Sequence, residues 1–287
     1  MSSTNTALSA EAESLIPQLE TALREGELSV PMLPEVAGKV VSLSQDPDSD
    51  ASRLAQLIQG DQSLAGHVMR IANSAAYSPN GSMVSLQQAI TRLGMNLISD
   101  IALAASISTK MFDAPGFEEH IDRIWQHSLT TALWSKEIAR ICRRNVEATF
   151  LCGLLHSIGR PVVLQAVIEI SRDKQLPLTR EDILILESTY QREVGAKVVD
   201  KWEMPKIVCD AVLHFDNYEE ANLAKDQTTM VNGGAQFASH VLDPEALDLE
   251  TLKGLPVLAD LNLYQDEVER LLDMKDAIAS TREAMSA

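Results

Sequence analysis

His156 is the residue of this sequence whose position most favours a chemical role. It follows an apolar run from Phe150 to Leu155, and Ser157, Ile158 and Gly159 come directly after it. A neutral imidazole can bind a metal ion or transfer a proton near neutral pH. The serine beside it carries no charge and is a poor ligand for divalent cations. The sequence therefore places a histidine at the end of a buried segment without an acid next to it.

An aspartate-rich turn is the second place where metal chemistry is conceivable. Asp46, Asp48 and Asp50 occupy positions one, three and five of a calcium-loop pattern. Position six of that pattern requires glycine, and position twelve requires glutamate. The sequence has Ala51 and Leu57 there. Both departures favour a simple turn that caps the following helix.

Other motifs that carry chemistry are missing or weak. The sequence has no GxSxG nucleophile elbow, no P-loop and no dinucleotide fingerprint. Arg140, Arg143 and Arg144 form a basic cluster, but no aromatic residues alternate with them. Such a cluster is more often a solvated helix face than a nucleic-acid site. None of these features assigns the protein to an enzyme class that uses such motifs.

The overall composition limits the partners of the protein. The 287 residues include 24 basic and 41 acidic ones, so the formal net charge is 24 − 41 = −17. This balance disfavours nucleic acid and anionic membranes as partners. The first residues are not typical of a secretory signal, and we find no apolar run near the roughly 18 residues of a membrane span. Three scattered cysteines without a CxxC pair suit a reducing compartment, so we expect a cytoplasmic location.

The elements that position these residues are predicted to be helices. Apolar residues recur three and four positions apart, as at Val36, Val40 and Leu43. Ser85 and Gln88 predict a capping box, and residues 95–112 predict a buried helix with small residues. Strict alternation of apolar and polar residues, typical of strands, is scarce. We therefore expect an all-α fold.

Turns and changes in composition suggest an organisation along the chain. Residues 1–14 are predicted to be a flexible tail, and 15–241 one composite domain. A turn at 113–116 divides this domain into a helical subdomain, 15–113, and a second half, 117–241. Residues 242–287 form an acidic extension in which Tyr264, Val268 and Leu271 indicate an amphipathic helix. This helix is predicted to pack on the body of the protein or on a partner.

Several phrases, in the same order, resemble the HDOD family, the HD-related output domain. In the first half these are LPEVAGKVVSLSQDPDSD, LIQGDQSLAGHVMRIANSAAY and SLQQAITRLG; in the second half they are WQHS, GLLHSIG, EVGAKVVDKWEMP and AVLHF. The resemblance covers about residues 30–215. It implies an N-terminal helical subdomain packed on a degenerate core like that of HD phosphohydrolases. It also implies a role in bacterial signalling, generally without catalysis.

The resemblance also implies where the metal ligands of the related hydrolases would fall. The retained histidines are His127, His156 and His214. The central aspartate is replaced by Ser157, a further histidine by Gln191, and a late aspartate by Gln236. Losing both acids should abolish a two-metal site, because carboxylates and imidazoles hold the ions and lower the pKa of the bound water. The alternatives are a remnant site for one zinc ion on three imidazoles, or core histidines that hydrogen-bond their neighbours.

We therefore expect a non-catalytic regulatory module without a cofactor or metal, whose partners are other signalling proteins. Self-association is left open. One alternative is an HD-type phosphohydrolase with weak metal-dependent activity. Another is a sensor that binds a nucleotide or anion in the degenerate pocket, with Arg160 as the anion contact. An arginine at this place more often pairs with a nearby acid, so we favour a structural role for Arg160.

Overall fold

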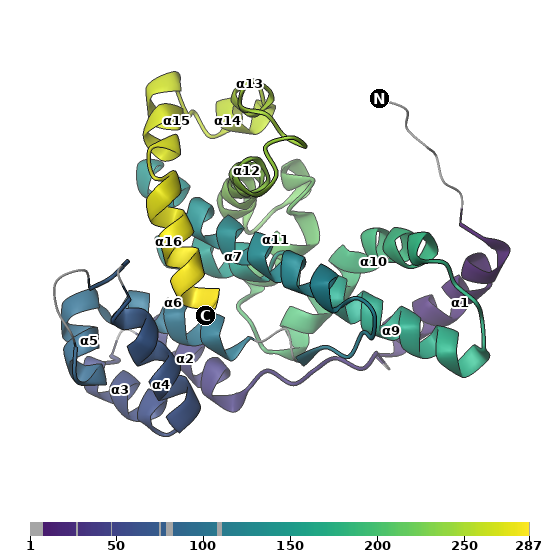
Figure 1. Ribbon diagram of the computed structural model, residues 1–287, viewed down its shortest axis with the longest axis horizontal. Coiled ribbons are helices and arrows are strands. Elements are labelled where there is room, and N and C mark those ends of the chain that lie inside the picture. The colour runs from purple at the N-terminus through teal and green to yellow at the C-terminus, as the bar shows by residue number, and fades with distance from the viewer. Residues whose placement is uncertain are drawn as a thin grey trace.

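The computed structural model describes residues 8–26, 28–46, 48–74, 76–78, 83–107 and 111–286. Within these ranges every regular element is helical and no strand occurs, as the sequence predicts (Figure 1). The helices of the first half are α1 (Ala10–Glu25), α2 (Glu35–Gln45), α3 (Ala51–Gln59), α4 (Gln62–Ala72), α5 (Leu86–Leu93) and α6 (Met95–Ser106). The second half contains α7 (Glu118–Ile141), α8 (Val146–Leu155), α9 (Gly159–Lys174), α10 (Arg180–Lys201), α11 (Lys206–His214), the 3₁₀ turn η2 (Tyr218–Glu220) and α12 (Lys225–Leu242).

Helices α2 to α6 form a bundle at one end of the molecule (Figure 1). Their starts follow from side-chain caps: Asp50 accepts a hydrogen bond from the backbone N–H of Arg53, and Asp61 accepts one from Leu64. Ser85 accepts one from Gln88, as predicted, although the side chain of Gln88 reaches the N–H of Val84 instead. Helix α6 ends at Ser106, before the end of the predicted helix 95–112, whose residues 108–110 lie outside the described ranges.

Helix α1 corrects the predicted organisation in two ways. It begins at Ala10, inside the segment predicted as a tail, because Ser9 caps its first turn and also bonds the carboxylate of Asp182. Residues 1–7 of that predicted tail are outside the described ranges. The helix packs against α9 and α10, at the end opposite to α2–α5 (Figure 1). Helix α1 therefore belongs with the second half of the chain, since apolar periodicity does not say which partner a helix has.

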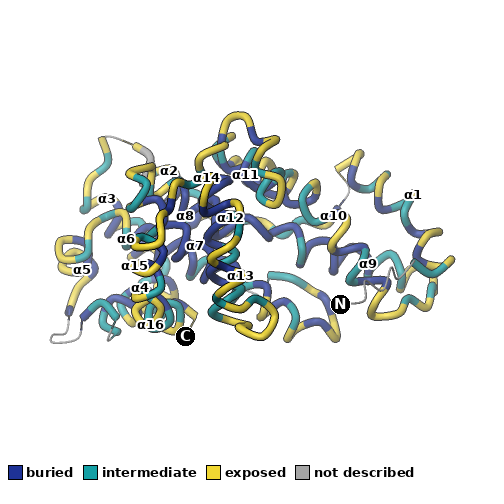
Figure 2. The backbone as a smooth tube through the Cα atoms, turned by 90° about the horizontal axis from the view of Figure 1, so that it is seen from above, coloured by how far each residue is buried: buried dark blue, intermediate teal, exposed yellow. Residues whose placement is uncertain are grey.

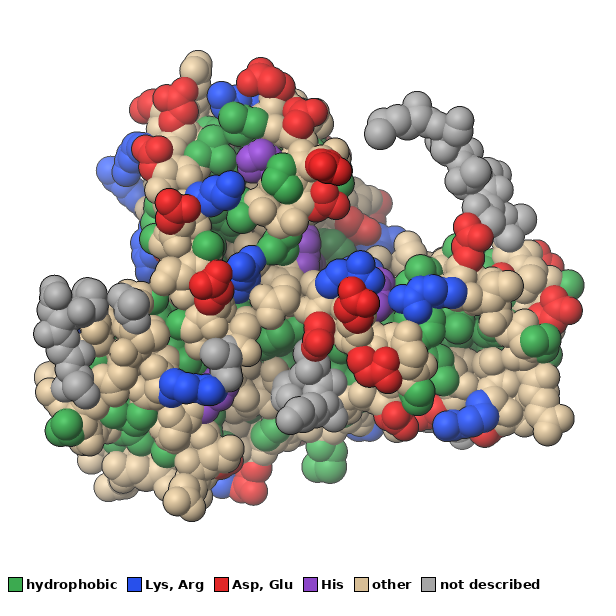
Figure 3. All heavy atoms as spheres, in the orientation of Figure 1, with side chains coloured by type: hydrophobic (Ala, Val, Ile, Leu, Met, Phe, Trp, Pro, Cys, Tyr) green, Lys and Arg blue, Asp and Glu red, His purple; other side chains and the backbone are tan. Residues whose placement is uncertain are grey.

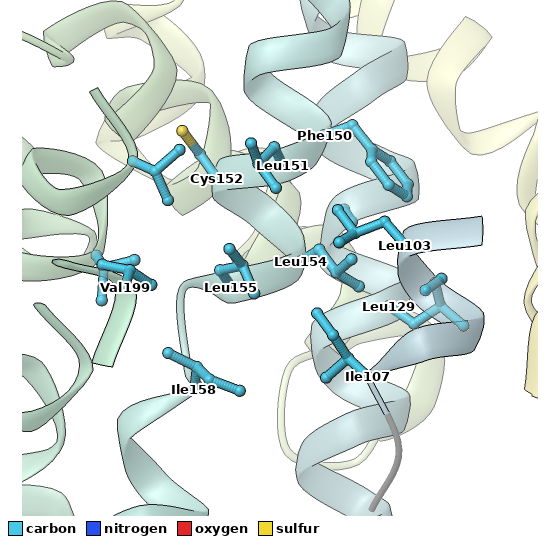
Figure 4. Packing of buried hydrophobic residues seen from close by; sticks show 14 of the residues in the cluster. Leu103, Ile107, Leu129, Phe150, Leu151, Cys152, Leu154, Leu155, Ile158 and Val199 are labelled. Carbon is cyan, nitrogen blue, oxygen red and sulfur yellow. The ribbon is translucent and has the colours of Figure 1, made fainter. Parts of the chain in front are cut away.

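The centre of the core is formed by α7, α8 and α12, which Figure 2 shows as the largest buried region. Helix α8 is apolar on all sides and is covered by α6, α7, α11 and α12. Figure 4 shows Phe150, Leu151, Leu154 and Leu155 of this helix projecting in several directions into the core. A Cβ at Gly153 would lie only 2.8 Å from the Cα of Ala132, so glycine allows α8 to approach α7.

The segment 146–174 is long and apolar enough, by composition alone, to cross a membrane. The run counted in the sequence stopped at Leu155, but helix α9 continues the apolar composition after a short turn. In the structure 89% of the most apolar window is buried inside the protein. Packing in the core accounts for this hydrophobicity.

The acidic extension contains four helices, where the sequence predicted one. They are α13 (Leu249–Lys253), α14 (Pro256–Asp260), α15 (Gln265–Leu272) and α16 (Lys275–Ser286). Helical structure is interrupted between α14 and α15 at Asn262, whose φ of 55° does not continue a right-handed helix. Helix α16 packs against α6 and α7, and Ser286 bonds the side chain of Gln126. The extension thus joins both halves of the protein.

Candidate functional site

His156 lies at the C-terminal end of α8 and is 4% exposed. Its Nδ1–H donates to the carbonyl oxygen of Gly153 over 2.7 Å, because a carbonyl can only accept. Burial lowers the pKa of His156 to about 3, and positive charge on His127 and Arg160 acts in the same direction. The imidazole is therefore neutral at physiological pH.

His127 comes from the middle of α7 and faces His156. The ring centroids are 5.9 Å apart, and the ring of Phe215 meets His156 edge-on at 5.0 Å. Nε2 of His127 is hydrogen-bonded to Oγ of Ser239 on α12, over 3.0 Å. Burial, followed by the charge of Arg160, lowers the pKa of His127 to about 4. The structure thus brings two neutral, buried imidazoles together between α7, α8 and α12.

Ser157, at the position of the central acid, points toward α7 and is buried. Its Oγ lies 2.5 Å from Oγ of Ser128. Because the hydroxyl of Ser128 donates to the carbonyl of Ile124, Ser157 is the donor between the two serines. The crevice beside them has a volume of only about 20 Å³, lined by aromatic and aliphatic side chains such as Trp125. This space is too small for a phosphate ester and holds one water molecule at most.

Two of the other predicted side chains bond to residues outside the histidine pair. Gln191 on α10 donates to the backbone carbonyl of Ser188, one turn earlier on the same helix. His214 on α11 pairs with Asp210, at 3.6 Å between Nε2 and Oδ1. Gln236 is half-buried on α12, three residues before the Ser239 that contacts His127. Within the described residues, no group of three or more His, Cys, Asp or Glu side chains is placed to hold a metal ion. The side chains at these positions lack the carboxylates that the resemblance assigns to the metal centre of the related hydrolases.

Arg160 belongs to a charged cluster with Glu187, an acid that the sequence analysis did not single out. Its Nε donates to Oε1 of Glu187 over 2.6 Å, and the other carboxylate oxygen of Glu187 lies 2.8 Å from Nε2 of His120. The Glu187 side chain is 2% exposed, whereas that of Arg160 is 31% exposed. The cluster ties the starts of α7 and α9 to α10. A signal was present, because Glu187 interrupts the apolar stripe of Ile183 and Val194 on α10, and a buried acid requires a partner.

The comparisons with known proteins agree with the all-α fold. The family model of the HDOD domain matches residues 30–218. An HDOD domain protein from Geobacter sulfurreducens superimposes with a TM-score of 0.72 at 22% identity, covering 94% of this chain and 98% of that chain. An all-helical protein of HD-like fold is thus the class that the architecture defines. The chain belongs to the HDOD family.

Three further proteins are similar to this chain, and their names point to different functions or to none. A protein from Shewanella amazonensis SB2B, whose name proposes a metal-dependent phosphohydrolase, has a TM-score of 0.73 at 22% identity and covers 96% and 100% of the two chains. One from Marinobacter aquaeolei VT8, whose name proposes a signal transduction protein, has a TM-score of 0.69 at 21% identity, covering 100% of this chain and 69% of that chain. An uncharacterised protein of Treponema pallidum (strain Nichols) is 20% identical over 201 residues. That match spans 67% of this chain and 38% of the length of this curated relative.

The buried histidines predict a measurable pH dependence of stability. Both have folded-state pKa values below the 6.5 of a free histidine, so their contribution is present above pH 6.5 and is lost as the pH falls toward 4. In that pH window each of the two histidines lowers the free energy of unfolding by about 1.4 kcal/mol for every unit by which the pH falls. We expect His156→Gln to reduce the loss of unfolding free energy between pH 7 and pH 5 by about 2 kcal/mol relative to the wild type. Urea unfolding at both pH values measures this, and equal losses in the two proteins would contradict a buried neutral His156.

Proposed function

We propose that this protein is a non-catalytic, cytoplasmic signalling module that acts by binding other proteins. The observation that carries the proposal is the hydrogen bond of the Ser157 hydroxyl with Ser128, at the position where the related hydrolases have an acid. The HDOD match and the relative named for signal transduction fit a signalling role. A hydrolase of the related type needs an acid where this chain has a hydroxyl that is committed to its neighbour.

The hydrogen bonds of the surrounding residues support the same proposal. Nδ1 of His156 is bonded to Gly153, and Nε2 of His127 to Ser239, so two imidazole nitrogens are held by protein groups. Arg160 is paired with the buried Glu187, which favours its structural role over an anion contact. Among the described residues, Asp and Glu side chains gather over the lobe of α13–α15, as Figure 3 shows on the face in view. This surface suits attraction of a basic protein rather than nucleic acid or an anionic membrane.

The test is a search for phosphohydrolase activity with and without added Mn²⁺. We expect no turnover of nucleotides, cyclic dinucleotides or generic phosphate esters above a blank that contains a His127→Ala, His156→Ala variant. Ser157→Asp alone is expected to leave activity at this level, because Gln191 and Gln236 still replace two further ligands. Metal-dependent turnover that disappears in the double variant, together with about one bound metal ion per chain, would establish the hydrolase instead.

A further inference from the structure

A cleft of about 450 Å³ separates the N-terminal bundle from the second half of the protein. It lies away from the histidine pair and is bounded by α2, α6, α8 and the start of α11. Its walls are mostly apolar and include Val40, Leu103, Leu151 and Ile207. This volume is in the range of sites that enclose a small ligand or one large side chain.

The charged side chains that line this subdomain cleft are both acidic, Asp100 and Glu147. Asp100 is buried and bonds Nζ of Lys136 over 2.5 Å, so a protein cation already balances its charge. Glu147 is exposed in the first turn of α8, where its Oε1 accepts from the amide of Asn96. No ion pair of Glu147 is found among the residues that the structure describes. Glu147 is therefore the charge at the cleft that is available to a ligand.

Ser99 provides a second, independent sign of a ligand. It is 5% exposed and lines the cleft, yet its hydroxyl has no hydrogen-bond partner in the described part of the chain. A buried hydroxyl without a partner is unfavourable, and native proteins rarely leave one so. The hydroxyl itself is covered by protein, so a donor in the cleft can satisfy it only after the Ser99 side chain turns toward the cleft.

We propose that the subdomain cleft binds an arginine or lysine side chain of a partner protein, within a segment that carries apolar residues on either side. The aliphatic part of such a side chain packs on Leu103 and Leu151, while its N–H groups donate to the exposed carboxylate of Glu147 and, once the Ser99 side chain turns toward the cleft, to that hydroxyl. An acidic segment is disfavoured, because none of the described residues that line the cleft is basic. The inference rests on the proposed function, since it names the surface through which the module holds its partner.

The test uses the full chain and three peptides, acetyl-Leu-Arg-Leu-amide and its analogues with glutamine or glutamate at the centre. Binding is followed through the backbone amide signals of the ¹⁵N-labelled protein. We expect the arginine peptide to shift signals of residues 96–103, 147–151 and 206–208, and to bind at least tenfold more tightly than the glutamate peptide. Equal binding of all three peptides, shifts confined to other regions, or no binding would each overturn the proposal.

Two variants locate the contact. Ala148→Trp places a large ring in the cleft from the first turn of α8 and should weaken arginine-peptide binding at least tenfold. Glu147→Gln removes the exposed charge and should weaken it at least threefold, and this variant keeps the test valid if Ala148→Trp does not fold. Glu245→Gln, an exposed acid outside the cleft, is the matched control and should bind like the wild type.

The cleft and the proposed function can fail separately. If hydrolysis is absent and an identified partner protein binds Ala148→Trp as tightly as the wild type, the cleft inference is wrong and the binding function stands. If metal-dependent hydrolysis is found, the proposed function is wrong whatever the peptides do.

Discussion

Replacing Gly159 with alanine is expected to lower the free energy of unfolding by at least about 3 kcal/mol, at or beyond the upper end of typical overpacking costs. A Cβ at this first residue of α9 would lie 1.9 Å from the carbonyl oxygen of Gln191 and 2.5 Å from the backbone nitrogen of Gly195. Both neighbours are backbone atoms of α10, so no side-chain rotation relieves the clash. Helices α9 and α10 would have to separate. Urea unfolding followed by circular dichroism measures the change.

Two other glycines supply controls for this prediction. A Cβ at Gly66, within α4, would meet no atom within 4 Å, so Gly66→Ala should stabilise the protein by up to about 1 kcal/mol through helix propensity. A Cβ at Gly195 would meet Cγ1 of the Val212 side chain at 2.8 Å and the backbone nitrogen of Gly159 at 3.3 Å, so its backbone contact is less close than that at Gly159. Gly195→Ala should therefore fall between the other two. If Gly159→Ala unfolds like Gly66→Ala, the close approach of α9 and α10 is incorrect.

The all-α fold was predictable because it follows from local signals. Apolar residues at three and four positions and caps such as Ser85 act within one or two turns of a helix, so they can be read along the chain. The position of α1 could not be predicted in this way. It depends on contacts such as that between Ser9 and Asp182, which are 173 residues apart. The division of the predicted amphipathic helix into α15 and α16, at Asp273 and Met274, likewise comes without a glycine or proline signal in the sequence.

The candidate site shows the same division. The resemblance singled out His127 and His156, and the structure places their rings side by side. Sequence reasoning did not foresee that Ser157 bonds Ser128, because the two residues are on different helices. It also missed Glu187, Asp100 and Lys136 as buried charges. A charged residue inside an apolar stripe signals burial, but its partner is known only when the helices are assembled.

The ion pair of Lys136 and Asp100 carries the second large expected effect. It joins α7 to α6, with a side-chain exposure of 10% for each partner. Burial raises the pKa of Asp100 to about 6 even though Lys136 acts against this shift, so the carboxylate depends on its partner to remain ionised. We expect Lys136→Met to lower the free energy of unfolding at pH 7.5 by about 3–5 kcal/mol, because it leaves a buried acid without a counter-charge.

A second substitution in this variant distinguishes the contribution of the ion pair to stability from that of side-chain packing. Adding Asp100→Leu to Lys136→Met removes the unpaired acid and should restore most of the lost stability, since an apolar pair of similar volume often replaces a buried ion pair at little cost. Lys206→Met is the matched control: its partner is Asp200, the side chains are 76% and 62% exposed, and this variant should lose far less stability than Lys136→Met because water screens the pair. Urea midpoints of the four proteins, wild type included, measure these differences. If the double variant is no more stable than Lys136→Met, the lost stability comes from the packing of the aliphatic part of Lys136 and not from the unpaired carboxylate. The two halves of the protein are then joined by apolar contact rather than by charge.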